Sequence, residues 1–345
     1  MTQAVIASEA KQSSDRHTKS GLLRRPCGAP RNDETRRGVC DLLALRAGML
    51  TLRFDWRLAA AFAPRLTIFS AMTYVEAASA PLRKTGQIKI HGAAAFEGMR
   101  RAGRLAAECL DMLVGEIKPG VSTERIDRLV YEFGHDHGSM PATLMYRGYR
   151  KATCTSVNHV VCHGIPSDKP LRDGDILNVD VTLILDHWHG DSSRMYAVGE
   201  IPRRAERLIE VTYEAMMRGI AAIKPGGTTG DIGHAIQTYV EAQHMSVVRD
   251  FCGHGVGRLF HDEPNVVHVG RPGEGIVLKP GMFFTVEPMI NLGRPHVKVL
   301  SDGWTAVTRD RSLSAQFEHS VGVTENGVEI FTLSPKRLDK PPYRA

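Results

Sequence analysis

Two stretches of the chain share one pattern of apolar and polar positions. Apolar residues recur at helical spacing over 96–117 and again over 202–223, and a Lys-Pro-Gly turn follows each stretch. A Ser or Thr then precedes a second helical pattern in each copy. Matching apolar positions in these second patterns are Ile126, Val130 and Phe133, and Ile232, Ile236 and Tyr239. The pattern predicts four helices in two similar pairs, 106 residues apart.

β-branched stretches with turn signals follow each predicted helix pair. An α/β unit of about 100 residues that occurs twice in one domain predicts a pseudo-two-fold arrangement, because each unit buries its apolar face against the other. We therefore expect an α/β fold with a functional site where the two halves meet.

Composition excludes several classes of protein. The 345 residues are 42% hydrophobic and 24% charged, as in ordinary globular proteins. The longest apolar stretch, 58–70, is interrupted by Pro64 and Arg65 and is too short to cross a bilayer, which takes about 20 residues. We expect no membrane association.

The net charge of +6 comes wholly from the first fifth of the chain. Residues 1–71 contain 12 Lys/Arg and 6 Asp/Glu and have no sustained hydrophobic period, whereas the remaining residues are balanced in charge. We predict that 1–71 is a disordered basic extension or a mis-assigned start, with the true start at Met72, and that 72–345 is one catalytic domain. The balanced charge of that domain predicts no specific nucleic-acid partner.

The six cysteines are scattered, without a CxxC pair or zinc-ribbon spacing. In a chain of this length, that pattern favours reduced thiols in a cytosolic compartment. The first 20 residues are polar and contain no signal-peptide core. We therefore predict a cytoplasmic protein.

Two carboxylates lie in a predicted hairpin. The segment 175–184 alternates as a buried strand with Asp180 and Thr182 on one face, a turn follows near residue 186, and Asp191 lies on the returning strand. Neighbouring carboxylates in apolar surroundings repel each other unless a proton or cation lies between them. A bound metal ion explains this pair better than a structural role.

Three further ligand candidates lie in apolar, strand-like surroundings. His254 is flanked by glycines, Glu287 lies in a predicted strand over 282–290, and Glu318 lies in the segment 314–319. Four carboxylates and one imidazole form an oxygen-rich set that suits two divalent ions such as Mn²⁺, Fe²⁺ or Co²⁺. Two ions that share a water generate hydroxide at neutral pH and polarise a carbonyl group.

These residues, in this order, resemble the dinuclear site of the methionine aminopeptidases. The resemblance covers 88–333 and includes NHVVCHGIP (158–166), GHGVGR (253–258), VEPM (286–289) and RSLSAQFEH (311–319). It implies the pita-bread fold, in which two similar helix pairs pack on a curved, mainly antiparallel sheet. The 33-residue spacing from His254 to Glu287 and the lack of N-terminal zinc modules are typical of the bacterial type I enzymes.

The resemblance also implies a role for each matched residue. Asp180 would bind one ion, Asp191 and Glu318 would bridge both, and His254 with Glu287 would complete the second. Thr182 would assist at the first ion, and Glu287 would also shuttle a proton. His163 would contact the substrate amine or scissile amide, and His261 the peptide carbonyl oxygen. The methionine side chain would lie among Tyr146, Tyr149, Cys154, Phe260 and Trp304. Thr143 stands where the bacterial enzymes have a second pocket cysteine.

The expected activity is removal of the initiator methionine from nascent proteins and peptides that have a small second residue. The cofactors would be two ions of Co, Mn, Fe(II) or Zn. The partners would be nascent N-termini and, transiently, the ribosome, with the enzyme a monomer. Two alternatives are an aminopeptidase P or prolidase, for which 1–71 is too short to be the usual N-terminal domain, and a non-catalytic binding protein of the same fold.

Overall fold

The computed structural model describes residues 73–343. The prediction about 1–71 lies outside the described residues. Within residues 73–343, no helix is long and apolar enough to cross a membrane.

In the part of the chain that the structure describes, four long helices occur as two successive pairs. They are α2 (Ala93–Leu113), α3 (Thr123–Asp136), α4 (Arg203–Ala221) and α5 (Thr229–Ala242). The second helix of each pair begins after a side-chain cap: Ser122 accepts a hydrogen bond from the backbone N–H of Arg125, and Thr228 from that of Asp231. The Asp231 side chain also accepts a bond from the backbone N–H of Thr228, which completes a capping box. The predicted helix pairs and their caps are therefore confirmed.

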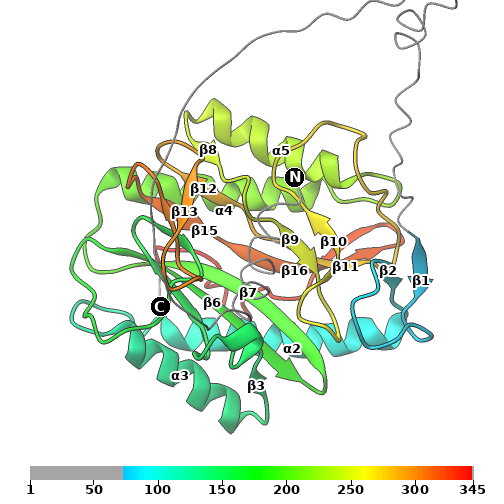
Figure 1. Ribbon diagram of the computed structural model, residues 1–345, viewed down its shortest axis with the longest axis horizontal. Coiled ribbons are helices and arrows are strands. Elements are labelled where there is room, and N and C mark those ends of the chain that lie inside the picture. The colour runs from blue at the N-terminus through cyan, green and yellow to red at the C-terminus, as the bar shows by residue number, and fades with distance from the viewer. Residues whose placement is uncertain (1–72, 344–345) are drawn as a thin grey trace, which may run out of the picture. The chain divides into compact units, whose positions relative to one another are not determined.

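A nine-stranded antiparallel sheet forms the centre of the fold (Figure 1). Its main path runs β10 (Asp262–Val266), β9 (Gly253–Gly255), β11 (Phe283–Val286), β16 (Glu318–Thr324), β7 (Trp188–Ala197), β6 (Ile176–Leu185) and β3 (Met140–Pro141). Beside this path, β17 (Gly327–Ile330) pairs with β16, and β4 (Cys154–Val157) pairs with β6. The first half of the chain therefore supplies one side of the sheet and the second half the other.

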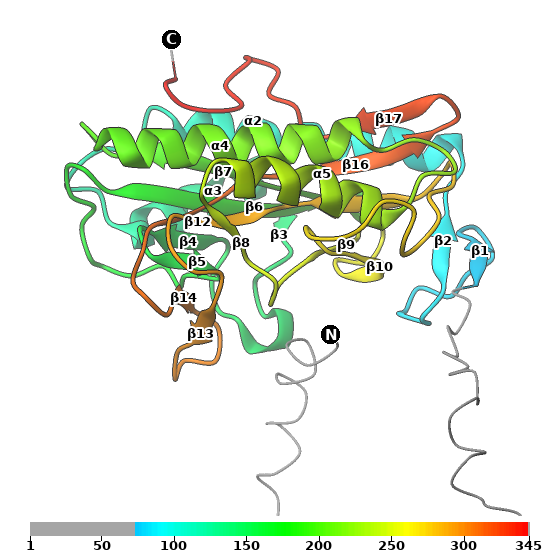
Figure 2. The same cartoon turned by 90° about the horizontal axis from the view of Figure 1, so that it is seen from above.

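Three smaller strand groups surround this sheet. One contains β15 (Ser314–Gln316), β12 (Met289–Asn291) and β8 (Ser246–Val247). Another contains β13 (Val297–Val299), β14 (Ala306–Thr308) and β5 (Val160–Cys162), and β1 (Tyr74–Glu76) pairs in parallel with β2 (Ile88–Ile90). Figure 2 shows α2, α4 and α5 on one side of the sheet and the β13–β14 hairpin on the other.

Each half of the fold has its own apolar core beneath its helices. Leu177, Val179, Val181 and Leu183 of β6 pack with residues of α2 and α3, whereas Val321 and Val323 of β16 pack with residues of α4 and α5. These strand residues are the odd-numbered ones, so the even-numbered side chains of β6 and β16 point to the opposite face. That opposite face carries Asp180, Thr182 and Glu318.

Two predicted strands can be compared with the structure. The strand predicted over 175–184 is present as β6, and the turn after it contains Asp186 and His187, both with positive φ. The single strand predicted over 282–290 is wrong, because it is divided into β11 and β12 with Glu287 and Pro288 between them. Pro288 has no N–H to donate to a ladder, and the Glu287 N–H donates to His268 Nε2 over 3.0 Å instead.

A fully buried ion pair connects α2 to the last described segment. Arg194 of β7 pairs with Asp111 of α2, and their side chains are 1% and 0% exposed. Ser334 Oγ donates to both Asp111 carboxylate oxygens (2.8 and 2.9 Å), and Arg194 Nη1 donates to the Leu338 carbonyl (2.9 Å). The pair therefore holds the segment after β17 against the helix layer.

We expect Asp111→Ala to lower the free energy of unfolding by about 3–5 kcal/mol, because it leaves the buried Arg194 charge without its partner. Glu108→Ala removes an exposed pair on the same helix and should cost less than about 1 kcal/mol. Urea unfolding of both variants measures the difference. Equal losses would contradict a central role for the buried pair.

Candidate metal centre

The register of three neighbouring strands places three carboxylates together. Ser193 of β7 lies directly opposite Asp180 of β6 on one side and Glu318 of β16 on the other. Asp191 precedes Ser193 by two residues and therefore points to the same face. The three carboxylates thus come from three adjacent strands and share one face of the sheet.

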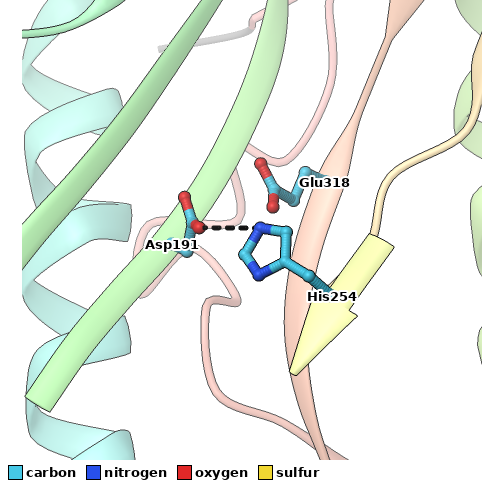
Figure 3. A group of neighbouring side chains, drawn as sticks. All are labelled: Asp191, His254 and Glu318. Carbon is cyan, nitrogen blue, oxygen red and sulfur yellow. Dashed lines mark ion pairs between the residues drawn. The ribbon is translucent and has the colours of Figure 1, made fainter. Parts of the chain in front are cut away.

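An imidazole from β9 points into this group. The ligand atoms of Asp191, His254 and Glu318 all lie within 4.8 Å of one another (Figure 3). His254 Nε2 lies 3.6 Å from Asp191 Oδ2 and 3.6 Å from Glu287 Oε1. The His254 imidazole therefore lies between a carboxylate of the first half of the fold, Asp191, and one of the second half, Glu287.

Short polar contacts hold the carboxylates in place. Thr182 Oγ1 donates to Asp191 Oδ1 over 2.6 Å, and Thr285 Oγ1 donates to Glu287 Oε1 over 2.7 Å. Gln316 Nε2 donates to Glu287 Oε2 over 3.3 Å. These donors fix side-chain orientation without neutralising any charge.

Glycines allow β9 to approach its neighbours closely. A Cβ on Gly253 would lie 2.2 Å from the Thr285 carbonyl oxygen, and one on Gly255 would lie 2.1 Å from the Glu263 carbonyl oxygen. No larger residue fits without moving the strand. The residues that flank His254 are therefore set by backbone packing.

Burial makes the ionised carboxylates unfavourable. It raises the pKa of Asp180 to about 7, and it raises the pKa values of Asp191, Glu287 and Glu318 well above their usual range, with repulsion between the carboxylates adding to the effect. Burial lowers the pKa of His254 to about 4, so this imidazole is neutral at pH 7.

The donor set fits divalent cations. Within residues 73–343, no Lys or Arg forms an ion pair with any of the four carboxylates. A divalent cation would relieve their mutual repulsion, and a neutral imidazole is the form of histidine that binds metals. Asp191, His254 and Glu318 form a group of side chains that could hold a metal ion.

Aromatic rings form one wall beside the cluster. The His261 ring lies 4.1 Å from that of His254 and is stacked against that of Tyr146 at 5.1 Å, measured between centroids. The Phe260 ring lies 4.9 Å from that of Tyr146 and 6.2 Å from that of His254. Three of the predicted substrate-binding residues thus lie next to the imidazole.

The other predicted pocket residues form a second group. The Trp304 ring lies 5.1 Å from that of Tyr149 and 6.2 Å from that of His163. Cys154 pairs directly with Asp180 across β4 and β6, which connects this group to the carboxylates. Thr143 Oγ1 donates to the Lys151 carbonyl over 3.0 Å, so its hydroxyl is engaged with the backbone.

Several residues near the site carry no recognisable sequence signal. Thr285 contacts both His254 and Glu287. The Nδ1 atom of the buried His189 ring lies 2.9 Å from the Gly257 carbonyl oxygen. Lys89 of β2 pairs with Asp262, the residue after His261. The Thr285–Glu287 contact joins residues two apart, whereas the other contacts join segments far apart in the chain, which a single sequence does not reveal.

Comparison with known proteins defines the class. Residues 97–325 match the model of metallopeptidase family M24, and the chain belongs to that family. A methionine aminopeptidase of Rickettsia prowazekii is 58% identical over 258 residues, which are 74% of this chain and 99% of the relative. The chain is a metal-dependent aminopeptidase of the pita-bread fold.

Solved structures agree with this assignment. The crystal structure of methionine aminopeptidase from Rickettsia prowazekii has a TM-score of 0.71 and 57% identity, covering 72% of this chain and all of that one. Methionine aminopeptidase from Thermotoga maritima has a TM-score of 0.70 and 42% identity, covering 71% of this chain and 99% of that one. The expected fold is therefore confirmed.

Asp191→Asn should stabilise the metal-free protein at pH 8 by about 1 kcal/mol or more, because it removes one repelling carboxylate yet can still accept the Thr182 bond. Because the pKa of the Asp191 carboxyl is raised in the folded state, stability falls as pH rises above the ordinary carboxyl pKa of about 4, so the advantage should disappear near pH 4. Thermal unfolding in chelator measures it. With Mn²⁺ added, the wild type should become the more stable protein; an advantage that did not depend on pH would contradict the electrostatic explanation.

Proposed function

We propose that this enzyme removes the initiator methionine from nascent proteins and peptides with a small second residue. The observation that carries the proposal is the position of His254. Its Nε2 atom faces the carboxylate cluster, and its ring packs on that of His261 in the aromatic wall. The proposed cation site would thus lie directly next to the proposed side-chain pocket. The names of the relatives at 51–58% identity support the same substrate.

Asp180, Asp191, His254, Glu287 and Glu318 are the residues that would hold two divalent ions. Following the family resemblance, Asp191 and Glu318, which come from adjacent strands, would serve both ions, Asp180 would serve one, and His254 with Glu287 would serve the other. Bound there, the ions would generate hydroxide from a shared water and polarise the scissile carbonyl. Mn²⁺, Fe²⁺ and Co²⁺ suit this set best, and Zn²⁺ also binds such ligands.

Glu287 is the proposed proton carrier. It is buried, its pKa is raised by burial, and the Thr285 and Gln316 donors fix both of its oxygens. A raised pKa makes a carboxylate a stronger base, which suits Glu287 to accept a proton from the attacking water and return it to the leaving amine.

His163 and His261 are the proposed substrate contacts. Burial lowers the pKa of His163 to about 4 and that of His261 well below its usual value, so both rings are neutral at pH 7. A neutral imidazole presents one N–H donor and one acceptor nitrogen. His163 is thereby suited to the substrate amine or amide, and His261 to the peptide carbonyl oxygen.

The proposed methionine pocket contains Tyr146, Tyr149, Cys154, Phe260 and Trp304. Aromatic rings and sulfur suit a polarizable thioether. Burial raises the pKa of the Cys154 thiol well above its usual value, so it stays protonated and takes no part in nucleophilic chemistry. Cys154 therefore contributes to the shape and softness of the pocket.

The biological setting follows from the proposed substrate. Nascent chains carry the initiator methionine as they leave the ribosome, so we propose a cytoplasmic enzyme that contacts the ribosome transiently and works as a monomer. The catalytic domain would comprise 72–345, with 1–71 dispensable.

With Mn²⁺ or Co²⁺, the full chain should release methionine from Met-Ala-Ser and leave Ala-Pro-Ala intact, and chelator should abolish release. Amino-acid analysis of the products measures both reactions. Cleavage of the prolyl peptide alone would assign the chain to the prolidase-like members of the fold. Methionine release that persisted after exhaustive chelation would contradict the metal centre.

His163→Ala should lower turnover by at least about 10²-fold, because a substrate contact is lost, while Mn²⁺ affinity stays at the wild-type value. His254→Ala should lose both turnover and metal affinity. Peptide kinetics and calorimetric titration of Mn²⁺ separate the two roles. Loss of metal binding in His163→Ala would show that His163 supports the metal centre.

A further inference from the structure

One buried hydroxyl contacts two of the proposed ligand residues from different strands. Thr285 Oγ1 accepts a hydrogen bond from the backbone N–H of His254 (3.0 Å) and donates one to Glu287 Oε1 (2.7 Å). The Thr285 side chain is fully buried. Because a hydroxyl has a single proton, its donor and its acceptor functions are each committed to one of the two ligand residues.

The backbone alone attaches β9 weakly to β11. A single register pair, Gly255 with Phe284, joins these two strands, and the Val256 N–H adds one bond of 3.3 Å to the Phe283 carbonyl. Next to this pair, the Thr285 hydroxyl supplies the bond to the backbone of His254. The close fit of Gly253 over Thr285 brings the two strands near enough for it.

Glu287 lies beyond the end of β11, so no ladder fixes its carboxylate. Its backbone N–H is taken by His268, its Oε1 accepts the 2.7 Å bond from Thr285, and its Oε2 accepts a longer bond of 3.3 Å from Gln316. Thr285 and Glu287 are two residues apart, which directs both side chains to the face that carries His254. The hydroxyl therefore links the backbone of His254 directly to the carboxylate of Glu287.

We propose that Thr285 is a positioning residue that aligns His254 and Glu287 for divalent-cation binding. The inference rests on the proposed metal centre. Groups that orient metal ligands through hydrogen bonds typically change metal affinity by about 10- to 100-fold when they are removed.

The test compares Thr285→Val, which keeps the shape but removes the hydroxyl, with Thr285→Ser, which keeps the hydroxyl. Thr212→Val is the matched control, because Thr212 is equally buried but donates to the Leu208 carbonyl within α4 (2.7 Å). The full chain is stripped with chelator and titrated with Mn²⁺ by calorimetry. The visible absorption spectrum with Co²⁺ reports the ligand geometry independently of activity.

Thr285→Val should bind Mn²⁺ about 10- to 100-fold more weakly and alter the Co²⁺ spectrum, whereas Thr285→Ser and Thr212→Val should behave as wild type. Wild-type affinity and spectrum in Thr285→Val would overturn the inference, and so would equal weakening in Thr285→Ser. If the metal-free Thr285→Val variant melts far below Thr212→Val, it is replaced by Thr285→Ala, which also removes the hydroxyl but adds no bulk. The Mn²⁺ affinity and the Co²⁺ spectrum of Thr285→Ala then decide the question by the same criteria. A His254→Ala variant that bound Mn²⁺ as tightly as wild type would overturn the metal centre itself and this inference with it.

Discussion

Electrostatic repulsion among buried carboxylates is the constraint on which the rest of the structure depends. Asp191, Glu287 and Glu318 are buried and Asp180 is half-buried beside them, and desolvation disfavours the charged forms of all four. A fold that keeps such groups together must supply the stabilising free energy elsewhere. The two apolar cores supply it on the helix side of the sheet.

The two halves of the fold contribute different parts of the site. The β6–β7 hairpin of the first half carries Asp180 and Asp191, whereas β9, β16 and the segment after β11 of the second half carry His254, Glu318 and Glu287. The halves meet where β7 pairs with β16. Helix-facing and site-facing residues alternate along these strands, so the same register that buries the apolar cores also aligns the ligands.

Much of this arrangement could be predicted from the sequence. Helical periodicity and capping residues gave the four helices, and strand alternation predicted that Asp180 and Thr182 share a face. The break at Glu287 was missed because the apolar run 282–290 was interpreted as continuous although Pro288, which cannot donate to a ladder, lies within it. The contact of the Glu287 N–H with His268 is a tertiary feature that the sequence does not show. Thr285, His189 and Lys89 were missed for a related reason. Their roles depend on which strands and loops become neighbours, and single-sequence patterns carry no information about that.

The central claim is that the five-residue cluster binds two divalent ions. Anomalous diffraction from crystals grown with Mn²⁺, measured on both sides of the manganese absorption edge, tests it most directly. The account predicts two strong anomalous peaks among Asp180, Asp191, His254, Glu287 and Glu318, with Asp191 and Glu318 next to both. An ordered cluster without anomalous density, or manganese bound only elsewhere on the protein, would contradict it.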